Sequence, residues 1–204
     1  MKTSLLLKST LALALATPLL ASAESQLITG AGSAVARLDF RVIVPRVLFL
    51  GVGTGAAAAT PATNATIDTV TFDYTTNPEA VGTGVAGVAG AITGNVVPVR
   101  VVGNNGQVSL TAATTGALTN AATPADTIPW SEITVSSNLP GLPSPVIPAT
   151  ATGASSNVLI SSGTKVTDHS AVWTYSYANS AVVAPGTYGT STGNGRVIYT
   201  ASMP

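Results

Sequence analysis

The sequence predicts an all-β protein, a single antiparallel β-sandwich of immunoglobulin-like or jelly-roll type. Apolar residues alternate with polar ones in several short runs, and no segment after residue 23 keeps a helical period although alanine is abundant. Glycine, proline, asparagine and threonine interrupt these runs at short intervals, which is typical of many short strands joined by turns. There is no fixed-period repeat and no internal boundary in composition, so residues 24–204 are predicted to form one domain.

The first 23 residues have the three parts of a secretory signal peptide. Lys2 and Lys8 supply positive charge, an apolar run follows from Leu11 to Leu20, and Ala21-Ser22-Ala23 is a small-residue cleavage signal. The apolar run is too short to span a bilayer, which needs roughly 20 residues. We therefore expect cleavage after Ala23 and an exported protein that is periplasmic, on the cell surface or extracellular. The short Ala/Leu-rich signal is typical of bacteria.

The composition excludes several classes of partner and points to assembly. Charged residues make up 8% of the chain, against about 25% in ordinary soluble domains. No basic patch is present, which argues against nucleic acid, and no later stretch is long and apolar enough for a membrane-spanning helix. The chain has no cysteine, so its stability must come from core burial, from assembly or from both. Low charge also weakens the repulsion that keeps protein molecules apart.

The first predicted strand covers residues 34–44, with its apolar side chains on one face and Arg37, Asp39 and Arg41 on the other. Pro45 interrupts it, and the apolar run 47–50 follows. Two interpretations stay open. Residues 24–50 are either an N-terminal donor-type extension that pairs with strand edges of a neighbouring subunit, or the first strands of the domain's own core. The candidate assembly residues are Leu38, Phe40, Val42, Val44, Leu48 and Leu50.

The middle of the chain carries further strand and turn signals. Residues 67–74 alternate, residues 96–102 are mostly β-branched, and alternation resumes from Val108. Asn105-Gly106 between the last two runs predicts a β-hairpin, because both central positions of that turn need positive φ. The proline-rich stretch 138–148 is predicted to be a surface loop.

The C-terminal third has the strongest strand signals. Trp173, Tyr175 and Tyr177 share one face of a predicted strand, and residues 196–202 form a terminal strand. The aromatic row has two interpretations, a buried core face or an exposed platform on which sugars stack. We favour the core, because alternating aromatic residues in a strand usually form the buried face of a sandwich.

The motifs that resemble catalytic or cofactor sites all lack their structural context, so we expect neither an enzyme nor a cofactor. The glycine strings 51–56 and 82–87 match a dinucleotide fingerprint but no helix follows either one. The string 189–193 matches a hydrolase nucleophile motif, yet a predicted strand follows it and the single histidine, His169, lies upstream. In Asp168-His169-Ser170 neighbouring residues point to opposite faces of a strand, so they cannot form a relay. One histidine and no cysteine also exclude the common zinc sites.

The last two predicted elements resemble a known family. Ala184-Pro185-Gly186-Thr187-Tyr188 followed by the strand 196–202 is similar to the end of secreted bacterial pilin-type subunits, including fimbrial and spore-coat-U-like proteins. The resemblance implies an incomplete immunoglobulin-like sandwich that the N-terminal extension of a neighbouring subunit completes. It also implies that the partners are copies of the chain or related subunits, with a periplasmic chaperone. The expected function is a structural, fimbria-like surface subunit. The alternative is a secreted non-catalytic binding module for carbohydrate or a surface adhesin.

Overall fold

The computed structural model describes residues 25–56, 60–85, 92–160, 164–189 and 194–204. The chain divides into two compact units, Met1–Val44 and Pro45–Pro204. All the strands lie in the second unit, and the described residues contain no α-helix. The predicted all-β fold is therefore confirmed.

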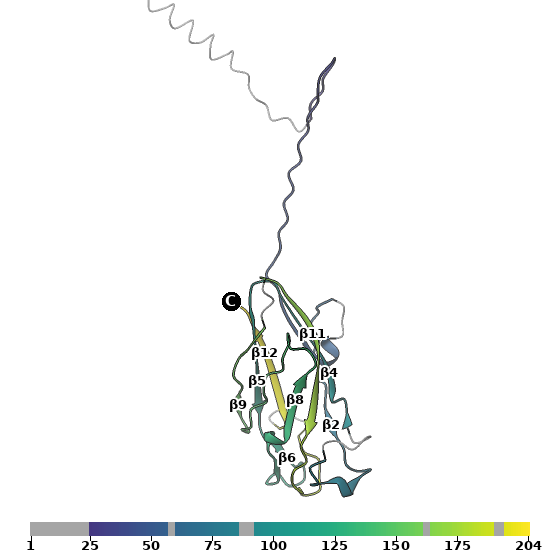
Figure 1. Cartoon of the computed structure of the whole chain (residues 1–204), viewed down its shortest axis with the longest axis vertical. Helices are drawn as coiled ribbons and strands as arrows, with labels where there is room; N and C mark the ends of the chain where they lie inside the picture. The colour runs from purple at the N-terminus through teal and green to yellow at the C-terminus, as the bar shows by residue number, and fades with distance from the viewer. Residues whose placement is uncertain (1–24, 57–59, 86–91, 161–163, 190–193) are drawn as a thin grey trace, which may run out of the picture. The chain divides into compact units, whose positions relative to one another are not determined.

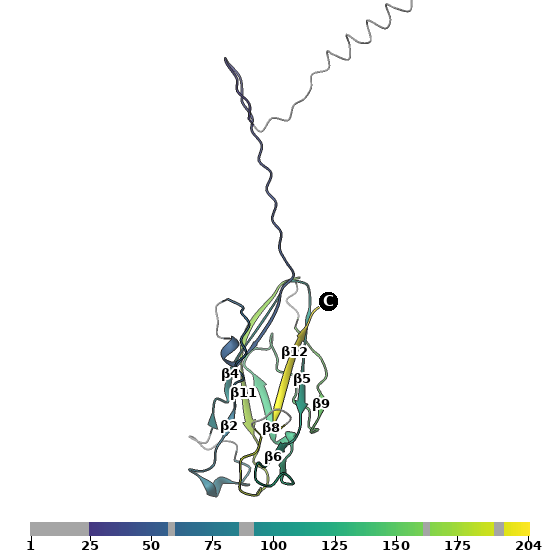
Figure 2. The same cartoon turned by 180° about the vertical axis from the view of Figure 1, so that it is seen from behind.

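The second unit is an antiparallel sandwich of two main sheets (Figures 1 and 2). The first sheet has the strand order β1-β4-β11-β8, and the second has the order β10-β5-β12 with β9 also paired to β5. The strands of the first sheet are β1 (Leu48–Val52), β4 (Val96–Gly103), β8 (Ile133–Ser137) and β11 (Thr167–Tyr177). Those of the second are β5 (Val108–Thr115), β9 (Gly153–Ala154), β10 (Val158–Ile160) and β12 (Arg196–Ser202).

Short elements make up the rest of the described secondary structure. Two small sheets pair β2 (Thr71–Phe72) with β3 (Ile92–Thr93) and β6 (Leu118–Thr119) with β7 (Thr127–Ile128). Three 3-10 helices are η1 (Gly53–Ala56), η2 (Pro78–Ala80) and η3 (Trp130–Glu132). The predicted strand 67–74 thus shrinks to two residues, because only Thr71 and Phe72 find a backbone partner.

The core lies between the inner faces of β4, β5 and β11. Every second residue of β4 and β5 is buried, and so is every second residue of β11 apart from the half-buried His169, as the alternating sequence predicts. Trp173 is the largest fully buried side chain, and its indole N–H donates to the carbonyl of Leu142 over 3.3 Å. The other fully or nearly buried core residues of the three strands include Val97, Val99, Val101, Val108, Leu110, Ala112, Ala171 and Tyr175.

The proline-rich stretch 138–148 is not simply a surface loop, which corrects the sequence prediction. It runs from β8 in the first sheet toward β9 in the second and buries Leu142, Pro145 and Ile147. The Ser137 hydroxyl donates to the carbonyl of Leu142 over 2.7 Å. The prolines therefore shape a segment that covers the core on the β8 side of the sandwich.

The predicted hairpin at Asn105-Gly106 is also wrong. Strand β4 pairs with β1 and β11, whereas β5 pairs with β10, β9 and β12, so the turn carries the chain from one sheet to the other. Of the two central positions, Gly106 has the positive φ that the signal requires, 91°, and Asn105 does not. The turn binds other parts of the chain, and the amide of Gly106 donates to the carbonyl of Lys165 over 3.0 Å.

Candidate functional site

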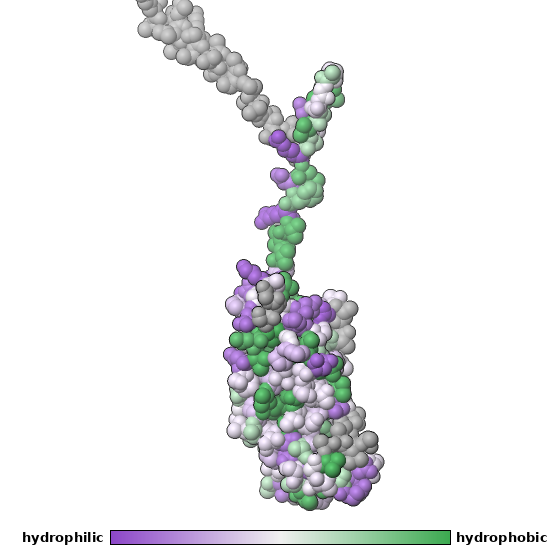
Figure 3. All heavy atoms as spheres, viewed as in Figure 1, coloured by the Kyte–Doolittle hydropathy of each residue, from purple (hydrophilic) through white to green (hydrophobic). Residues whose placement is uncertain are grey.

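The N-terminal unit contains the apolar segment 38–44, which is not a strand, and this corrects the prediction of a strand over 34–44. No residue from Ser25 to Val47 is assigned to a strand. The side chains of Leu38, Phe40, Val42 and Val44 are 76%, 87%, 84% and 73% exposed. A strand needs a second strand to satisfy its backbone groups, and these residues have no paired strand in the described chain. In Figure 3 this stretch is mostly green, the colour of apolar residues.

The other two candidate residues, Leu48 and Leu50, lie in a different place. Both are in β1, where Leu50 is paired with Val101 of β4 and packs against the core. The six residues that the sequence grouped together are thus divided at Pro45. Four belong to the exposed segment and two to the domain's own first strand.

A pair of asparagines fixes the point at which the chain enters the domain. The Asn104 side-chain amide donates to the carbonyl of Pro45 over 2.7 Å, and its side-chain oxygen accepts from the amide of Val47 over 2.8 Å. The neighbouring Asn105 side chain donates to the carbonyl of Pro204 over 2.6 Å. The turn between β4 and β5 therefore binds both ends of the domain. The sequence showed only a turn there, because nothing in an Asn-Asn-Gly string names its partners.

The same turn brings the start of β1 close to the end of β12. The Arg46 guanidinium donates to the carbonyl of Met203 over 3.5 Å, and a Cβ on Gly103 would lie 3.7 Å from both the Leu48 Cδ1 and the Met203 Sδ atoms. The domain's N-terminal entry point and its C-terminal end are thus neighbours.

In the described residues the edges of the two main sheets are formed by β1 and β8 in the first sheet and by β9, β10 and β12 in the second. Strands β1 and β8 have five residues each, β9 has two and β10 has three, so β12 with seven is the longest. Its inward side chains Val197, Tyr199 and Ala201 are only partly buried, unlike the inward side chains of β5 and β11. An edge strand of this length with unpaired backbone groups can accept a further strand.

The aromatic row belongs to the core and is not a sugar-binding platform. Trp173, Tyr175 and Tyr177 are all buried. The ring of Trp173 packs 5.0 Å from that of Tyr199, centroid to centroid. The hydroxyls of Tyr175 and Tyr199 hydrogen-bond over 2.9 Å and so join the two sheets.

Burial raises the pKa of these tyrosines. It is the main cause for Tyr177, whose pKa rises to about 12, with smaller effects from the charge of Glu132 and from two nearby tyrosines. It is also the main cause of the raised pKa of Tyr175 and Tyr199. A phenol whose pKa is higher in the folded state stabilises the fold below its unfolded pKa of about 10, and that stabilisation is lost as the pH rises above it.

We therefore expect the protein to lose stability above about pH 10. An alkaline titration followed by phenolate absorbance should show Tyr175, Tyr177 and Tyr199 ionising together with unfolding, which circular dichroism would detect. Replacing Tyr199 with Phe should remove one tyrosine from the group that ionises together with unfolding. Free ionisation of all five tyrosines near pH 10 in a folded protein would contradict this expectation.

The structure describes part of the motifs that resembled cofactor and catalytic sites. The first glycine string forms the end of β1 and the short helix η1, where Asp68 accepts a hydrogen bond of 2.8 Å from the Thr54 amide. His169 lies within β11. The strings 82–87 and 189–193 fall partly outside the described residues. Across the described ranges no group of His, Cys, Asp or Glu is arranged to hold a metal ion.

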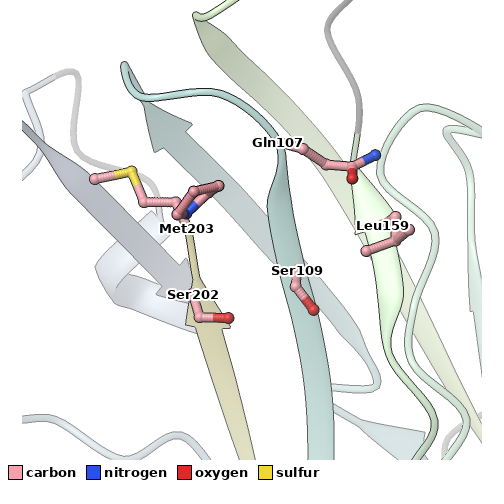
Figure 4. Close-up of a pocket in the computed structure, with 6 residues that line it drawn as sticks. Gln107, Ser109, Leu159, Ser202 and Met203 are labelled. Atoms are coloured by element: carbon pink, nitrogen blue, oxygen red, sulfur yellow. The ribbon is translucent and has the colours of Figure 1, made fainter.

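A shallow pocket lies at one end of the second sheet, with a volume of about 350 Å³. Figure 4 shows Ser109 on β5 and Ser202 on β12 beside Gln107, Leu159 and Met203. Its lining contains no charged side chain and no cluster of reactive groups. Nothing in its chemistry identifies a ligand.

Two further findings concern membrane-spanning helices and related proteins. In the part of the chain that the structure covers, no helix has the length and apolar character needed to cross a membrane. Comparison with family models, with curated proteins and with solved structures gives no match for this chain.

Proposed function

We propose that this protein is an exported structural subunit that assembles through β-strand pairing, with residues 38–44 as the strand that one subunit donates to another. The observation that carries this proposal is the exposed, alternating apolar row of Leu38, Phe40, Val42 and Val44. Four large apolar side chains in a row at over two-thirds exposure are a hydrophobic surface that needs a partner.

The spacing of the row defines what kind of partner it fits. In an extended strand, residues two apart share one face, so the four side chains form one apolar face about seven residues long. An extended segment of this kind binds by adding a strand to a sheet edge, with backbone hydrogen bonds for affinity and alternate side chains in pockets for specificity.

The apolar side chains of this row favour association. Burying a Val, Leu or Phe side chain contributes about 1.5–3 kcal/mol each, so four of them contribute roughly 6–12 kcal/mol before the cost of ordering the segment. Ordering a flexible segment on binding costs about 2–5 kcal/mol. The apolar burial exceeds this ordering cost by roughly 1–10 kcal/mol, which acts against the translational and rotational freedom lost on association. The low charge of the chain adds little repulsion.

A carbohydrate-binding module is the less supported alternative. The residues that suggested it, Trp173, Tyr175 and Tyr177, are buried and cannot stack on a sugar. The proposed structural role needs none of them at the surface.

The test compares the mature chain 24–204 with a truncated chain that starts at Pro45. The mature chain should form species larger than a monomer in analytical ultracentrifugation, and the truncated chain should stay monomeric with an unchanged strand-type circular dichroism spectrum. A peptide of residues 34–46 should bind the truncated chain. A mature chain that stays monomeric at high concentration, with no peptide binding, would show that the proposal is wrong.

A further inference from the structure

We propose that Asn105 is a modification site, at which the folded protein loses the side-chain amide by spontaneous deamidation, and that the turn between β4 and β5 loosens as a result. The chain contains two Asn-Gly pairs, Asn105-Gly106 and Asn194-Gly195. The fold leaves the first pair open to the reaction and protects the second. This inference does not depend on the function proposed above.

The reaction needs only the chain itself and water. The backbone nitrogen of the residue that follows the asparagine attacks the side-chain Cγ atom. A new C–N bond forms, the bond from Cγ to the side-chain nitrogen breaks, and ammonia leaves, which gives a succinimide ring. Water then opens the ring at one of its two carbonyls, to aspartate or to isoaspartate, and nothing is oxidised or reduced. A following glycine favours the attack, because it has no Cβ beside the nitrogen.

The two asparagine side chains are held to different extents. Asn105 donates one hydrogen bond, from its side-chain nitrogen to the carbonyl of Pro204 over 2.6 Å, and its side-chain oxygen accepts none from the described residues. Asn194 uses both atoms. Its oxygen accepts from the Thr119 amide over 2.8 Å, and its nitrogen donates to the Thr119 carbonyl over 3.3 Å. The Cγ atom of Asn105 is therefore the freer of the two to turn toward the next nitrogen.

The two glycines also differ in the space around them. Among the described residues, a Cβ added at Gly106 would meet only the Pro204 Cγ atom, at 4.0 Å. A Cβ added at Gly195 would lie 2.7 Å from the Gly189 Cα atom and 2.9 Å from the Leu118 Cδ2 atom. A succinimide ring thus has room to form at the first pair, whereas backbone and side-chain atoms crowd the second.

The hydrogen bonds of the first turn also open more readily. The Gly106 amide donates to the carbonyl of Lys165 over 3.0 Å, and both Lys165 and Pro204 are exposed. The Gly195 amide donates over 3.1 Å to Ala117, which lies between β5 and β6, and β6 is itself paired with β7. Local opening costs least free energy in exposed segments with few contacts. The nitrogen of Gly106 is therefore released for attack more often than that of Gly195.

The product removes a contact that holds the turn. A carboxylate at position 105 has no hydrogen to donate, so the bond to the Pro204 carbonyl is lost. Isoaspartate also lengthens the backbone beside Asn104, whose side chain binds Pro45 and Val47. The modification therefore weakens the contacts of the turn with both ends of the folded domain.

Trypsin separates the two Asn-Gly pairs into different peptides. It cuts after lysine and arginine, and the resulting peptides span residues 101–165 and 166–196. The mature chain 24–204 is kept folded in mildly alkaline buffer, because the attacking nitrogen must lose its proton, and samples taken over time are unfolded and digested. Mass spectrometry of the fragmented peptides locates each deamidated residue.

We expect Asn105 to react at least about tenfold faster than Asn194, which corresponds to about 1.4 kcal/mol between their free energies of activation. A smaller ratio in the folded chain, or no reaction at Asn105, would overturn the inference. In the chain unfolded in urea the two rates should become similar, because each asparagine precedes a glycine and neither is held. If the ratio persists in urea, it comes from the local sequence and the fold has no part in it.

The variant Asn105→Asp reproduces the aspartate product and tests its effect. We expect the Val47 amide and the amides at the end of β12 to exchange hydrogen faster than in the unmodified chain, while the rest of the sandwich stays the same. The matched control is Asn105→Gln, which keeps an amide donor and should show slower exchange than the Asp variant and no deamidation at this position. Exchange in Asn105→Asp that equals that of the unmodified chain would show that the turn does not loosen, and would overturn that part of the inference.

Discussion

Replacing Phe40 with Asp should abolish assembly of the mature protein and leave its domain folded. Phe40 is the largest side chain of the exposed apolar row and lies near its centre. The substitution removes about 2–3 kcal/mol of apolar burial and adds the cost of desolvating a carboxylate. Since about 1.4 kcal/mol changes an equilibrium constant tenfold, subunit affinity should fall at least about 100-fold. Sedimentation velocity across a range of concentrations measures this loss.

The matched control for Phe40 is Ile43. It is also large, apolar and exposed, but an extended segment places it on the opposite face. We expect Ile43→Asp to assemble within about threefold of the unmodified chain, since surface substitutions usually change free energies by less than ~0.5 kcal/mol. Equal loss in both variants would indicate that the segment associates without a defined face, and the strand-pairing proposal would then be wrong. Both variants should keep the strand-type circular dichroism spectrum of the unmodified chain, because the segment lies outside the folded domain.

The parts of the fold that can be predicted from the sequence are the strands whose own residues show which face is buried. Alternation predicts a terminal strand over residues 196–202, and β12 has the same bounds. It also predicts that the aromatic row of β11 belongs to the core, and this row is buried. In both cases the alternation of apolar and polar residues follows from one face being buried, and this information is local to the strand.

The parts that could not be predicted depend on partners far away in the chain. The Asn105-Gly106 string predicted a turn with positive φ at both positions, of which only Gly106 has it, and the string does not specify which sheet the next strand joins. Leu142 is a core residue in a segment whose prolines suggested a surface loop. Its burial depends on β8 and β11, which supply the Ser137 hydroxyl and the Trp173 indole that bind its carbonyl.

The candidate assembly segment shows the same limit more strongly. Alternation at Leu38, Phe40, Val42 and Val44 predicts that one face becomes buried, but it does not specify whether the burying surface belongs to the same chain. The hydrogen bonds that join Asn104 to Pro45 and Val47 could not be predicted from the sequence for a similar reason. An asparagine in a turn is consistent with many partners, and only the fold selects them.

The second large expected effect concerns stability and the residue Trp173. Its side chain is 0% exposed, its indole donates to the Leu142 carbonyl, and its ring packs against Tyr199 of the opposite sheet. Truncating it to Ala should leave a cavity at the contact between the sheets and cost about 3–5 kcal/mol of unfolding free energy. For a domain of this size that corresponds to a fall in Tm of roughly 6–20 °C.

Urea unfolding of the truncated chain that starts at Pro45 measures the effect of Trp173→Ala on the domain alone, since assembly adds to apparent stability. Trp173→Phe keeps a ring and loses the hydrogen bond, so it should cost less than the Ala variant by at least about 1 kcal/mol. Val96→Ala serves as the control, because Val96 is exposed on the neighbouring β4 and its loss should change stability by less than ~0.5 kcal/mol. If Trp173→Ala costs no more than Val96→Ala, the contact between the sheets does not depend on this ring. In that case the Tyr175–Tyr199 hydrogen bond would be the main contact that stabilises the aromatic row. Replacing Tyr199 with Phe would then lower the free energy of unfolding more than Trp173→Ala does.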